Sequence, residues 1–345
     1  MKAAVLHGPR DIRIEAYHDP EISPGMVLLR SRCVGICGSD QHYFEHGYCA
    51  AFVPDRPFIL GHEVAAEVVA VGDGVTHVRA GHVVAVNPAR NCGLCEYCKA
   101  GRINLCAHNI MLGSASTKPP TNGGLAEFLV VRADQCHPLP SGMDASLGAM
   151  IEPFAVVLHA VKRAGAIAGK RVLVTGAGAI GLMAALTAQA FGAAPVAIGD
   201  IVPERRAKAK ELGIDSVADP SSEGYANRAL ELSEGGFDVA FEASGAPPAL
   251  RGAIELVRPG GTIVQIGTLG AADIPLPLNR MMNKEINLVG SMRYGNVFDE
   301  AIRLVAAGRI NLRPLINGVF PLDEATGAFE FMADKARSFK VQIQI

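Results

Sequence analysis

Four of the eight cysteines in this 345-residue chain fall in one short stretch, CGLCEYCKAGRINLC, at residues 92–106. Their spacing is C-x2-C-x2-C-x7-C. Two intervening residues let neighbouring thiolates turn toward one point, and the longer loop returns the fourth, so the pattern is typical of a closed tetrahedral Zn²⁺ site. Disulfides and buried free thiols are the alternatives. The spacing favours a structural zinc site made by Cys92, Cys95, Cys98 and Cys106.

Composition narrows the alternatives. Hydrophobic residues make up 49% of the chain, enough for a buried core and two domains. The net charge of −2, and the few basic residues near the cysteines (Arg90, Lys99, Arg102), argue against a zinc-ribbon module and a nucleic-acid partner. The N-terminus alternates like a strand, with no signal-peptide core and no apolar run of the roughly 18 residues that a membrane span needs. We therefore expect a soluble cytoplasmic protein, in which clustered thiols bind metal.

A second set of candidate metal ligands lies upstream, in VGICGSDQHYFEHG from Val34 and LGHEVAAEVVAVGDGV from Leu60. Cys37, His62 and Glu63 offer a thiolate, an imidazole and a carboxylate. Three mixed ligands with an open fourth position are typical of catalytic zinc, which polarises an oxygen and lowers its pKa. A lone cysteine and a lone histidine are more often core or surface residues, so this prediction depends on its surroundings.

The surroundings of Cys37 include Ser39 and His42, a hydroxyl and an imidazole that could carry a proton away from the reacting alcohol. A further acid, Glu152, precedes a proline in MIEPFAVVLHA, at the expected start of a helix. Glu152 is either a helix N-terminal charge favoured by the macrodipole or an alternate zinc ligand that could instead hold a water on the metal. The sequence leaves both readings open.

The stretch GKRVLVTGAGAIGLMAALTAQAFG, residues 169–192, predicts a dinucleotide site. A short buried strand at 172–175 precedes Gly176, Gly178 and Gly181 in a G-x-G-x-x-G pattern that includes Ile180, and an apolar helix follows. Glycine makes the turn, admits a pyrophosphate and lets the helix pack closely. The glycine pattern alone is a weak signal, but the strand before it and the helix after it make it specific.

The acid that ends the next predicted strand, PVAIGD, is Asp200, 24 residues after Gly176. A carboxylate there accepts hydrogen bonds from the adenosine ribose and repels a 2′-phosphate, which favours NAD over NADP. Arg205 has three readings: packing on the adenine or ribose, a solvated helix charge, or a partner that softens the discrimination against NADP.

Three later stretches, FDVAFEASG, GTIVQIGTLG and INLVGSMRYG, predict further parallel strands. Strand ends in an open parallel sheet face the ligand crevice. The residues at these ends are candidates to contact the cofactor, or they only cap strands: Ser244, Gly267, Thr268, Ser291, Met292 and Arg293.

The organisation along the chain predicts an α/β protein of two domains. Residues 1–152 carry alternating valine-rich stretches that suit a β-barrel with long excursions. Residues 153–294 alternate strand and helix, as in a doubly wound parallel sheet. Residues from about 295 to 345 contain a helix and a terminal strand that we expect to complete the first domain.

Taken together, GICGSDQHY, GHE, the four-cysteine stretch, EPFAVVLHA, GAGAIG and GSMRY resemble the zinc-dependent medium-chain dehydrogenases of the alcohol and polyol group, over essentially the whole chain. The resemblance implies a GroES-like catalytic domain, a Rossmann domain, one catalytic and one structural zinc, and NAD-linked alcohol oxidation. It implies Cys37, His62 and Glu63 as catalytic-zinc ligands with Glu152 in or beside the ligand shell, the four cysteines as structural ligands, and a homo-oligomer, either a tetramer or a dimer.

Within that group, AVNPARNCGLCEYC, LGSASTKPPTNGGLAEF and GSMRYGNVFDEAI resemble the L-idonate-oxidising branch, with the sorbitol (polyol) branch second. The expected substrate is therefore a small sugar acid or polyol. Arg293, Tyr294 and Tyr43 are the candidate substrate contacts, since arginine can hold a carboxylate bidentately or donate to sugar hydroxyls. The alternative for Arg293 is a surface ion pair with Asp299 or Glu300.

Two other classes of function remain to be weighed. A dinucleotide-binding protein that has lost its chemistry should lack the metal ligands or the hydroxyl relay, yet Cys37, His62, Glu63, Ser39 and His42 are all present. A zinc-ribbon nucleic-acid binder disagrees with both the charge balance and the dinucleotide segment. The sequence favours an enzyme.

Overall fold

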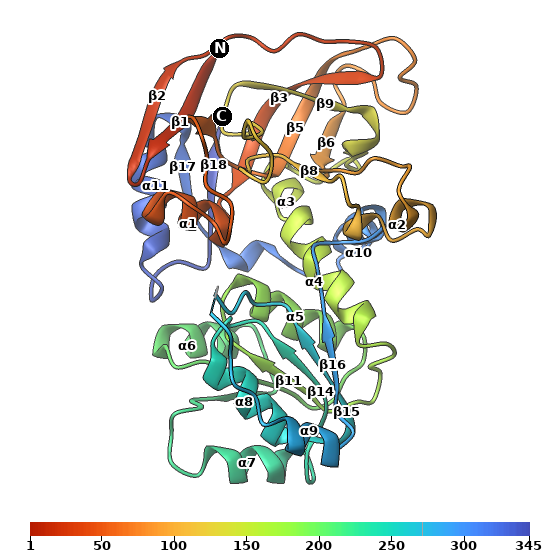
Figure 1. Cartoon of the computed structure of the whole chain (residues 1–345), viewed down its shortest axis with the longest axis vertical. Helices are drawn as coiled ribbons and strands as arrows, with labels where there is room; N and C mark the ends of the chain where they lie inside the picture. Colours follow the sequence, from red (N-terminus) through yellow and green to blue (C-terminus); the bar gives the residue numbers. More distant parts are fainter. Residues whose placement is uncertain (271) are drawn as a thin grey trace. The chain divides into compact units, whose positions relative to one another are not determined.

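A computed structural model describes residues 1–270 and 272–345. The chain forms two compact units (Figure 1). Unit 1 contains Met1–Pro153 and Gly295–Ile345, and unit 2 contains Phe154–Tyr294.

Unit 1 is rich in strands, and most of them are short. Its strands are β1 (Lys2–Gly8), β2 (Asp11–Ala16), β3 (Met26–Gly35), β4 (Phe58–Ile59), β5 (Glu63–Val71), β6 (Val83–Val86), β7 (Ala89–Arg90), β8 (Ile110–Met111), β9 (Phe128–Arg132), β10 (Cys136–Pro138), β17 (Ile316–Pro321) and β18 (Lys340–Gln344). Its helices are α1 (Gly38–His46), α2 (Glu96–Lys99), α3 (Ala145–Ala149), α10 (Phe298–Ala306) and α11 (Ala325–Ala333), and α4 (Ile151–Arg163) begins in it.

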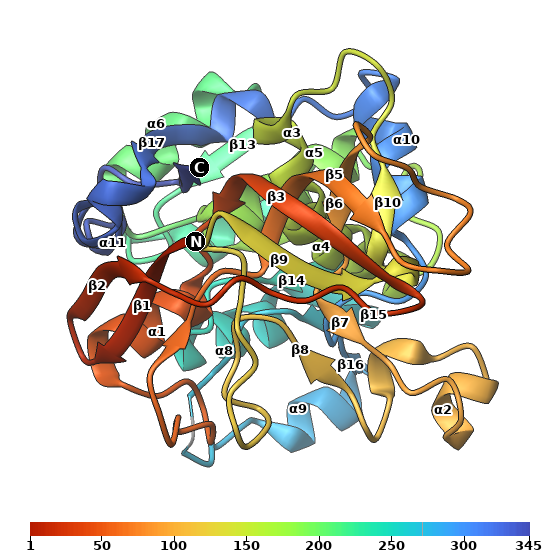
Figure 2. The ribbon, with the colours of Figure 1, turned by 90° about the horizontal axis from the view of Figure 1, so that it is seen from above.

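Strand β3 organises this unit. It pairs antiparallel with β5, β9 and β18, within a seven-stranded sheet in which β17 lies beyond β18. Figure 2 shows β3, β5, β6 and β9 side by side. The strand near the C-terminus, β18, pairs directly with β3, and its alternating apolar residues Val341 and Ile343 are buried in the same core as Val34.

Unit 2 alternates strand and helix. Its strands are β11 (Val172–Thr175), β12 (Val196–Gly199), β13 (Ser216–Ala218), β14 (Phe237–Glu242), β15 (Val257–Gln265) and β16 (Asn287–Gly290). Its helices are α5 (Ala179–Ala190), α6 (Pro203–Glu211), α7 (Tyr225–Leu232), α8 (Pro247–Leu256) and α9 (Leu278–Asn283), together with most of α4.

All pairings in the unit 2 sheet are parallel, in the order β13-β12-β11-β14-β15-β16. Numbered within the unit, this is 3-2-1-4-5-6, the order of a dinucleotide-binding doubly wound sheet, with its switch point between β11 and β14. The strands β11, β12 and β14 are buried along their length, as expected where helices cover both faces. The strand predicted at 172–175 matches β11, and Asp200 directly follows β12.

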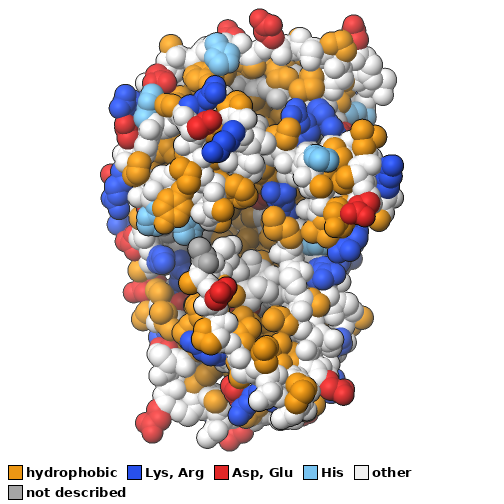
Figure 3. All heavy atoms as spheres, in the orientation of Figure 1, with side chains coloured by type: hydrophobic (Ala, Val, Ile, Leu, Met, Phe, Trp, Pro, Cys, Tyr) orange, Lys and Arg blue, Asp and Glu red, His pale blue; other side chains and the backbone are white. Residues whose placement is uncertain are grey.

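Among the described residues, every helix is too short or too polar to cross a membrane. On the face seen in Figure 3, acidic and basic side chains are interspersed. That mixture agrees with the small net charge and offers no broad basic surface on this face for a polyanion.

Candidate active site

The first candidate site lies where the end of β3 meets the start of β5. Gly35, the last residue of β3, pairs with Glu63, the first residue of β5. Cys37 follows β3 by two residues and His62 directly precedes β5, so the antiparallel register brings them together. The ligand atoms of Cys37, His62 and Glu63 lie within 4.8 Å of one another, and His62 and Glu63 are buried.

Asp40, which the sequence prediction did not assign a role, holds this cluster in place. Its Oδ2 accepts a hydrogen bond from the Cys37 backbone N–H at 2.9 Å, and its Oδ1 lies 3.4 Å from His62 Nδ1. Burial lowers the pKa of His62, but the nearby Asp40 and Cys37 outweigh burial and the pKa is raised. A carboxylate on Nδ1 orients the ring and leaves Nε2 for a metal, the usual arrangement around ligating histidines.

A second unpredicted residue, Lys340 of β18, pairs with Glu63. Both side chains are almost fully buried, and the Lys340 Nζ also donates to the Ile36 carbonyl at 3.1 Å. Burial lowers the pKa of Lys340, but Glu63 and Cys37 raise it further than burial lowers it. Glu63 therefore has a permanent cationic partner, and the negative charge that it brings to the cluster is partly compensated.

Glu152 is buried in the first turn of α4, as the sequence predicts for a helix start. It stands outside the cluster of Cys37, His62 and Glu63. Burial raises the pKa of Glu152 to about 7, while His62 opposes this shift and Glu63 adds to it. The position suits a group that holds water or exchanges with Glu63.

The relay candidates lie on α1. Ser39 is half-buried, and His42 is exposed with its ring 5.7 Å from that of His46. Residues three apart on a helix share one face, so Ser39 and His42 are neighbours on the surface of α1.

Tyr43, a candidate substrate contact, is buried in the core of unit 1. Its side chain is 2% exposed and packs edge-on against Phe58, and its hydroxyl accepts a hydrogen bond from the Ala115 backbone N–H at 3.0 Å. Tyr43 shares the inner face of α1 with Asp40 and Phe44, so the helix turns it into the core.

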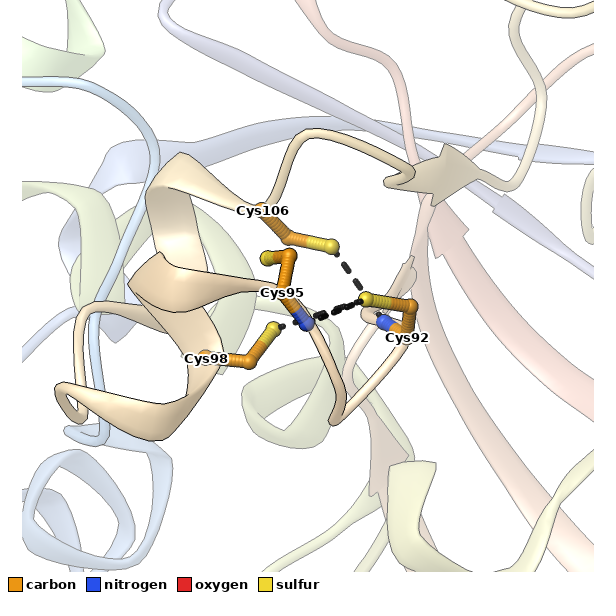
Figure 4. A group of neighbouring side chains, drawn as sticks. All are labelled: Cys92, Cys95, Cys98 and Cys106. Atoms are coloured by element: carbon orange, nitrogen blue, oxygen red, sulfur yellow. Dashed lines mark hydrogen bonds between the residues drawn. The ribbon is translucent and has the colours of Figure 1, made fainter.

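The four cysteines of the second cluster converge from a loop and the short helix α2 (Figure 4). All of them are free thiols. The Sγ atoms of Cys92 and Cys98 lie 4.0 Å apart, about twice the length of a disulfide bond. Zinc–sulfur bonds of about 2.3 Å give a tetrahedron edge of about 3.8 Å, so this spacing suits four thiolates around one Zn²⁺.

The backbone around this cluster also suits thiolates. Leu94 N–H and Cys95 N–H both donate to Cys92 Sγ at 3.4 Å, and these bonds lower the pKa of Cys92. Backbone N–H groups of Cys98 and Ala107 lower the pKa of Cys95 to about 6. Desolvation and hydrogen bonds with the neighbouring thiols raise the pKa of Cys98 to about 12.

The glycine loop of unit 2 has the steric features that a dinucleotide site needs. Gly176 has a φ of +92°, and a Cβ on it would lie 2.9 Å from Ser244. A Cβ on Gly181 would lie 1.8 Å from the Gly176 carbonyl oxygen, so no other residue fits there. Gly178 is the N-cap of α5, and the half-buried Ile180 lies in its first turn. The glycine loop therefore leads directly into the N-terminus of this helix.

Asp200 is buried and already accepts two backbone hydrogen bonds, from Ala177 N–H at 2.7 Å and Val202 N–H at 2.8 Å. It therefore ties the glycine loop to the end of β12. The Arg205 Nη1 lies 4.0 Å from the Asp200 Oδ2 and would be 3.5 Å from a Cβ on Gly178. Arg205 thus lies over the glycine loop rather than in open solvent.

The other cofactor candidates do follow the strand ends. Ser244 and Gly267 lie just beyond β14 and β15, where Gly267 N–H bonds to the Glu242 carbonyl at 2.9 Å, and a Cβ on Gly245 would meet the Thr268 carbonyl oxygen. Ser291 N–H donates to the Gln265 carbonyl at 2.9 Å.

The segment after β16 varies in exposure. Met292 is half exposed, whereas Tyr294 is 2% exposed and belongs to the core. Arg293 has a left-handed φ of +53°, which is uncommon for a residue with a side chain and often marks a functional position. Asp299, which the sequence offers as an ion-pair partner for Arg293, bonds to His137 Nδ1 at 2.7 Å.

Two protein-family models match the chain. The profile described as alcohol dehydrogenase GroES-like domain matches residues 23–141, and that described as zinc-binding dehydrogenase matches residues 179–307. Sorbitol dehydrogenase of Mus musculus is 39% identical over 343 residues, covering 99% of this chain and 94% of that protein. The chain belongs to the zinc-binding medium-chain dehydrogenase family.

Two solved structures extend the comparison. L-idonate 5-dehydrogenase from Escherichia coli superposes with a TM-score of 0.94 at 33% identity, covering 100% of this chain and 98% of that one. A zinc-binding dehydrogenase from Sinorhizobium meliloti bound to NADP has a TM-score of 0.90 at 30% identity, covering 100% and 99%. The predicted family and its two-domain α/β architecture, GroES-like and Rossmann, are confirmed, and the zinc-dependent alcohol and polyol dehydrogenases are the class to which this enzyme belongs.

Proposed function

We propose that the protein oxidises a secondary hydroxyl of a small sugar acid, with L-idonate converted to 5-keto-D-gluconate and NAD⁺ reduced to NADH. The observation that supports this reaction class is the cluster of Cys37, His62 and Glu63. A thiolate, an imidazole and a carboxylate would hold a zinc ion and leave its fourth coordination position for the substrate. Zinc bound there supplies a Lewis acid that lowers the pKa of the substrate hydroxyl.

The protein side chains handle the proton and the geometry. Ser39, half-buried at the start of α1, accepts the hydroxyl proton, and the exposed His42 passes it to solvent. Asp40 keeps the His62 ring in one orientation, and Glu152 holds water or exchanges with Glu63 as a ligand. Bound NAD⁺ would accept a hydride from the carbinol carbon while the hydroxyl proton leaves through Ser39, so the alcohol would lose one hydride and one proton and become a ketone.

The preference for NAD⁺ is proposed from Asp200, because a buried carboxylate beside the glycine loop disfavours a 2′-phosphate. Arg205, whose Nη1 lies 4.0 Å from the Asp200 Oδ2, would oppose this preference, and the neighbour from Sinorhizobium meliloti is a structure bound to NADP. Charge repulsion of about 1–3 kcal/mol corresponds to a preference of roughly 5- to 150-fold.

Sorbitol or xylitol is the second candidate substrate, favoured by the 39% identity to sorbitol dehydrogenase. Initial rates of NAD⁺ and NADP⁺ reduction with L-idonate, D-sorbitol, xylitol and D-gluconate separate the two. We expect the highest kcat/KM for L-idonate with NAD⁺. A higher kcat/KM for sorbitol or xylitol would replace the sugar-acid proposal and leave the reaction class in place.

Arg293 provides a sharper test of substrate class. If its guanidinium binds the substrate carboxylate, Arg293→Ala should raise KM for L-idonate by roughly 10- to 100-fold and raise KM for sorbitol much less. Equal increases for both substrates would show that Arg293 does not distinguish an acid from a polyol.

We also propose that the protein is a homo-oligomer. Within the described residues, β16 pairs with β15 alone, so it is an edge strand, and Leu288 on it is 39% exposed. Leu278 and Met282 of α9 are more exposed still, at 66% and 68%. An apolar sheet edge is a template for pairing with a second copy. Light scattering of Leu288→Lys should give a smaller particle than wild type.

A further inference from the structure

Glu242, the last residue of β14, has a completely buried side chain and collects hydrogen bonds from three neighbouring strand ends. Its Oε1 accepts from Ser244 N–H at 2.8 Å and from Gly245 N–H at 3.1 Å. Among the described residues, the donors to the carboxylate are the backbone N–H groups of Ser244 and Gly245 and the side-chain atoms Thr175 Oγ1, Ser244 Oγ and Gln265 Nε2. These donors are neutral, and within residues 1–270 and 272–345 no ion pair involves Glu242.

The donors come from adjacent positions in the sheet. Thr175 ends β11 and precedes the glycine loop, Ser244 follows β14, and Gln265 ends β15. The three strands lie in the order β11-β14-β15, next to the switch point where an open parallel sheet binds its ligand. The carbonyl of Glu242 adds bonds from the backbone N–H groups of Ile266 and Gly267, both at 2.9 Å.

The loops held by this carboxylate are packed closely on one another. A Cβ on Gly267 would lie 2.4 Å from Gly245 N and 2.9 Å from Glu242 Oε2. A Cβ on Gly176 would meet Ser244, so the glycine loop also leans on a residue that Glu242 holds. A buried acceptor with five donors fixes all of these loops together, because losing it leaves several buried donors unpaired.

We propose that Glu242 is a positioning residue for dinucleotide binding: its carboxylate fixes the glycine loop and the loops after β14 and β15 in the arrangement that accepts the cofactor. The inference rests on the proposed nicotinamide-dependent function. Glu242 acts through its neighbours and not on the reacting atoms, so it affects the affinity for the dinucleotide more than the chemical step.

The test compares four variants by calorimetric titration with NADH, since the chain has no tryptophan to report binding. Glu242→Gln keeps the length of the side chain and an acceptor at Oε1, and should bind within about 3-fold of wild type. Glu242→Ala removes the acceptor of all five donors and should weaken binding by roughly 10- to 100-fold, and Glu242→Asp, which is too short to reach every donor, should fall between them. KM for NAD⁺ should follow the same order, with kcat at saturating cofactor changed by less than about 3-fold.

The matched control is Asp238→Asn, a buried acid at the other end of the same strand that bonds Arg171 and Arg258. It should lower thermal stability and leave NADH affinity unchanged. Unchanged binding by Glu242→Ala, or an equal loss in Asp238→Asn, would overturn the inference. If Glu242→Ala does not fold, equal affinities of Glu242→Asp and Glu242→Gln would do so. Wild-type protein that binds neither NADH nor NADPH would instead refute the proposed function.

Discussion

The four-cysteine cluster takes all its ligands from residues 92–106, whereas the cluster of Cys37, His62 and Glu63 is assembled where the end of β3 meets the start of β5. The cysteine cluster is mostly half-buried and its sulfurs bond to their own loop. The mixed cluster is buried and depends on Asp40 and on Lys340 from a distant strand. One site is local and closed, which suits stability, and the other is assembled by the tertiary fold and open, which suits chemistry.

The largest effect should come from Cys37→Ser. Replacing the thiolate weakens the metal site that polarises the substrate, so kcat should fall by at least about 1000-fold while the melting temperature stays near that of wild type. Steady-state rates and circular dichroism measure the two quantities. Cys49→Ser, at a half-buried cysteine outside both clusters, is the matched control and should retain activity. An active Cys37→Ser enzyme would remove the distinction between the clusters.

Cys95→Ser should have the opposite effect, lowering stability while leaving kcat nearly unchanged. Losing one of four thiolates weakens the closed site, and the free energy of unfolding should drop by an amount on the order of 2–5 kcal/mol because metal binding contributes to folding. At a temperature where the variant is folded, kcat should remain close to wild type. Metal analysis of the unchelated wild-type protein should give two zinc ions per chain, and a value of one or none would count against both assignments.

Asp40→Ala should have a smaller effect, restricted to the mixed cluster. Removing a carboxylate that orients a ligating histidine typically weakens metal binding by roughly 10- to 100-fold. Competition with a chromogenic chelator should show one zinc released more readily and the second retained. Asp55→Ala, at an exposed acid, serves as the control. Equal weakening of both zincs in Asp40→Ala would mean that the clusters are not independent.

The smallest effect is expected for His42→Ala. The exposed imidazole is the outer end of the proposed relay, where solvent can partly replace it, so kcat should fall by about 10-fold or less. Added imidazole should restore part of the rate, and His46→Ala should show neither the loss nor the rescue. A His42→Ala enzyme that is as fast as wild type would exclude this residue from the proton path.

The contrast between the clusters also explains what the sequence could predict. Closely spaced cysteines and a glycine pattern between a strand and a helix are local signals, and residues 172–175 form the predicted strand. The sequence also carries a signal for Asp40, because it stands three residues after the candidate ligand Cys37. Its spacing from Tyr43 and Phe44 marks the inner face of a helix, which also explains why Tyr43 is buried.

Lys340 and Glu242 could not be found in this way. Lys340 meets a partner 277 positions away in the sequence, and only the pairing of β18 with β3 brings them together. In the sequence, Glu242 is one more residue of an apolar strand. Its role depends on hydrogen-bond donors to its carboxylate from β11 and β15, which the parallel sheet places beside it. Long-range pairing decides such contacts, and a single sequence carries little signal for it.

The pairing of β18 with β3 has a consequence for how the chain folds during its synthesis on the ribosome. Unit 1 is built from segments on both sides of Phe154–Tyr294, and its last strand brings the lysine that neutralises Glu63. During synthesis the dinucleotide-binding unit emerges whole and can fold first, while the earlier strands wait for a partner that is translated later. A product that stops before residue 340 would lack the strand and the lysine together, so an unfinished chain would carry an exposed edge on β3 and an uncompensated acid, features that chaperones and proteases act on.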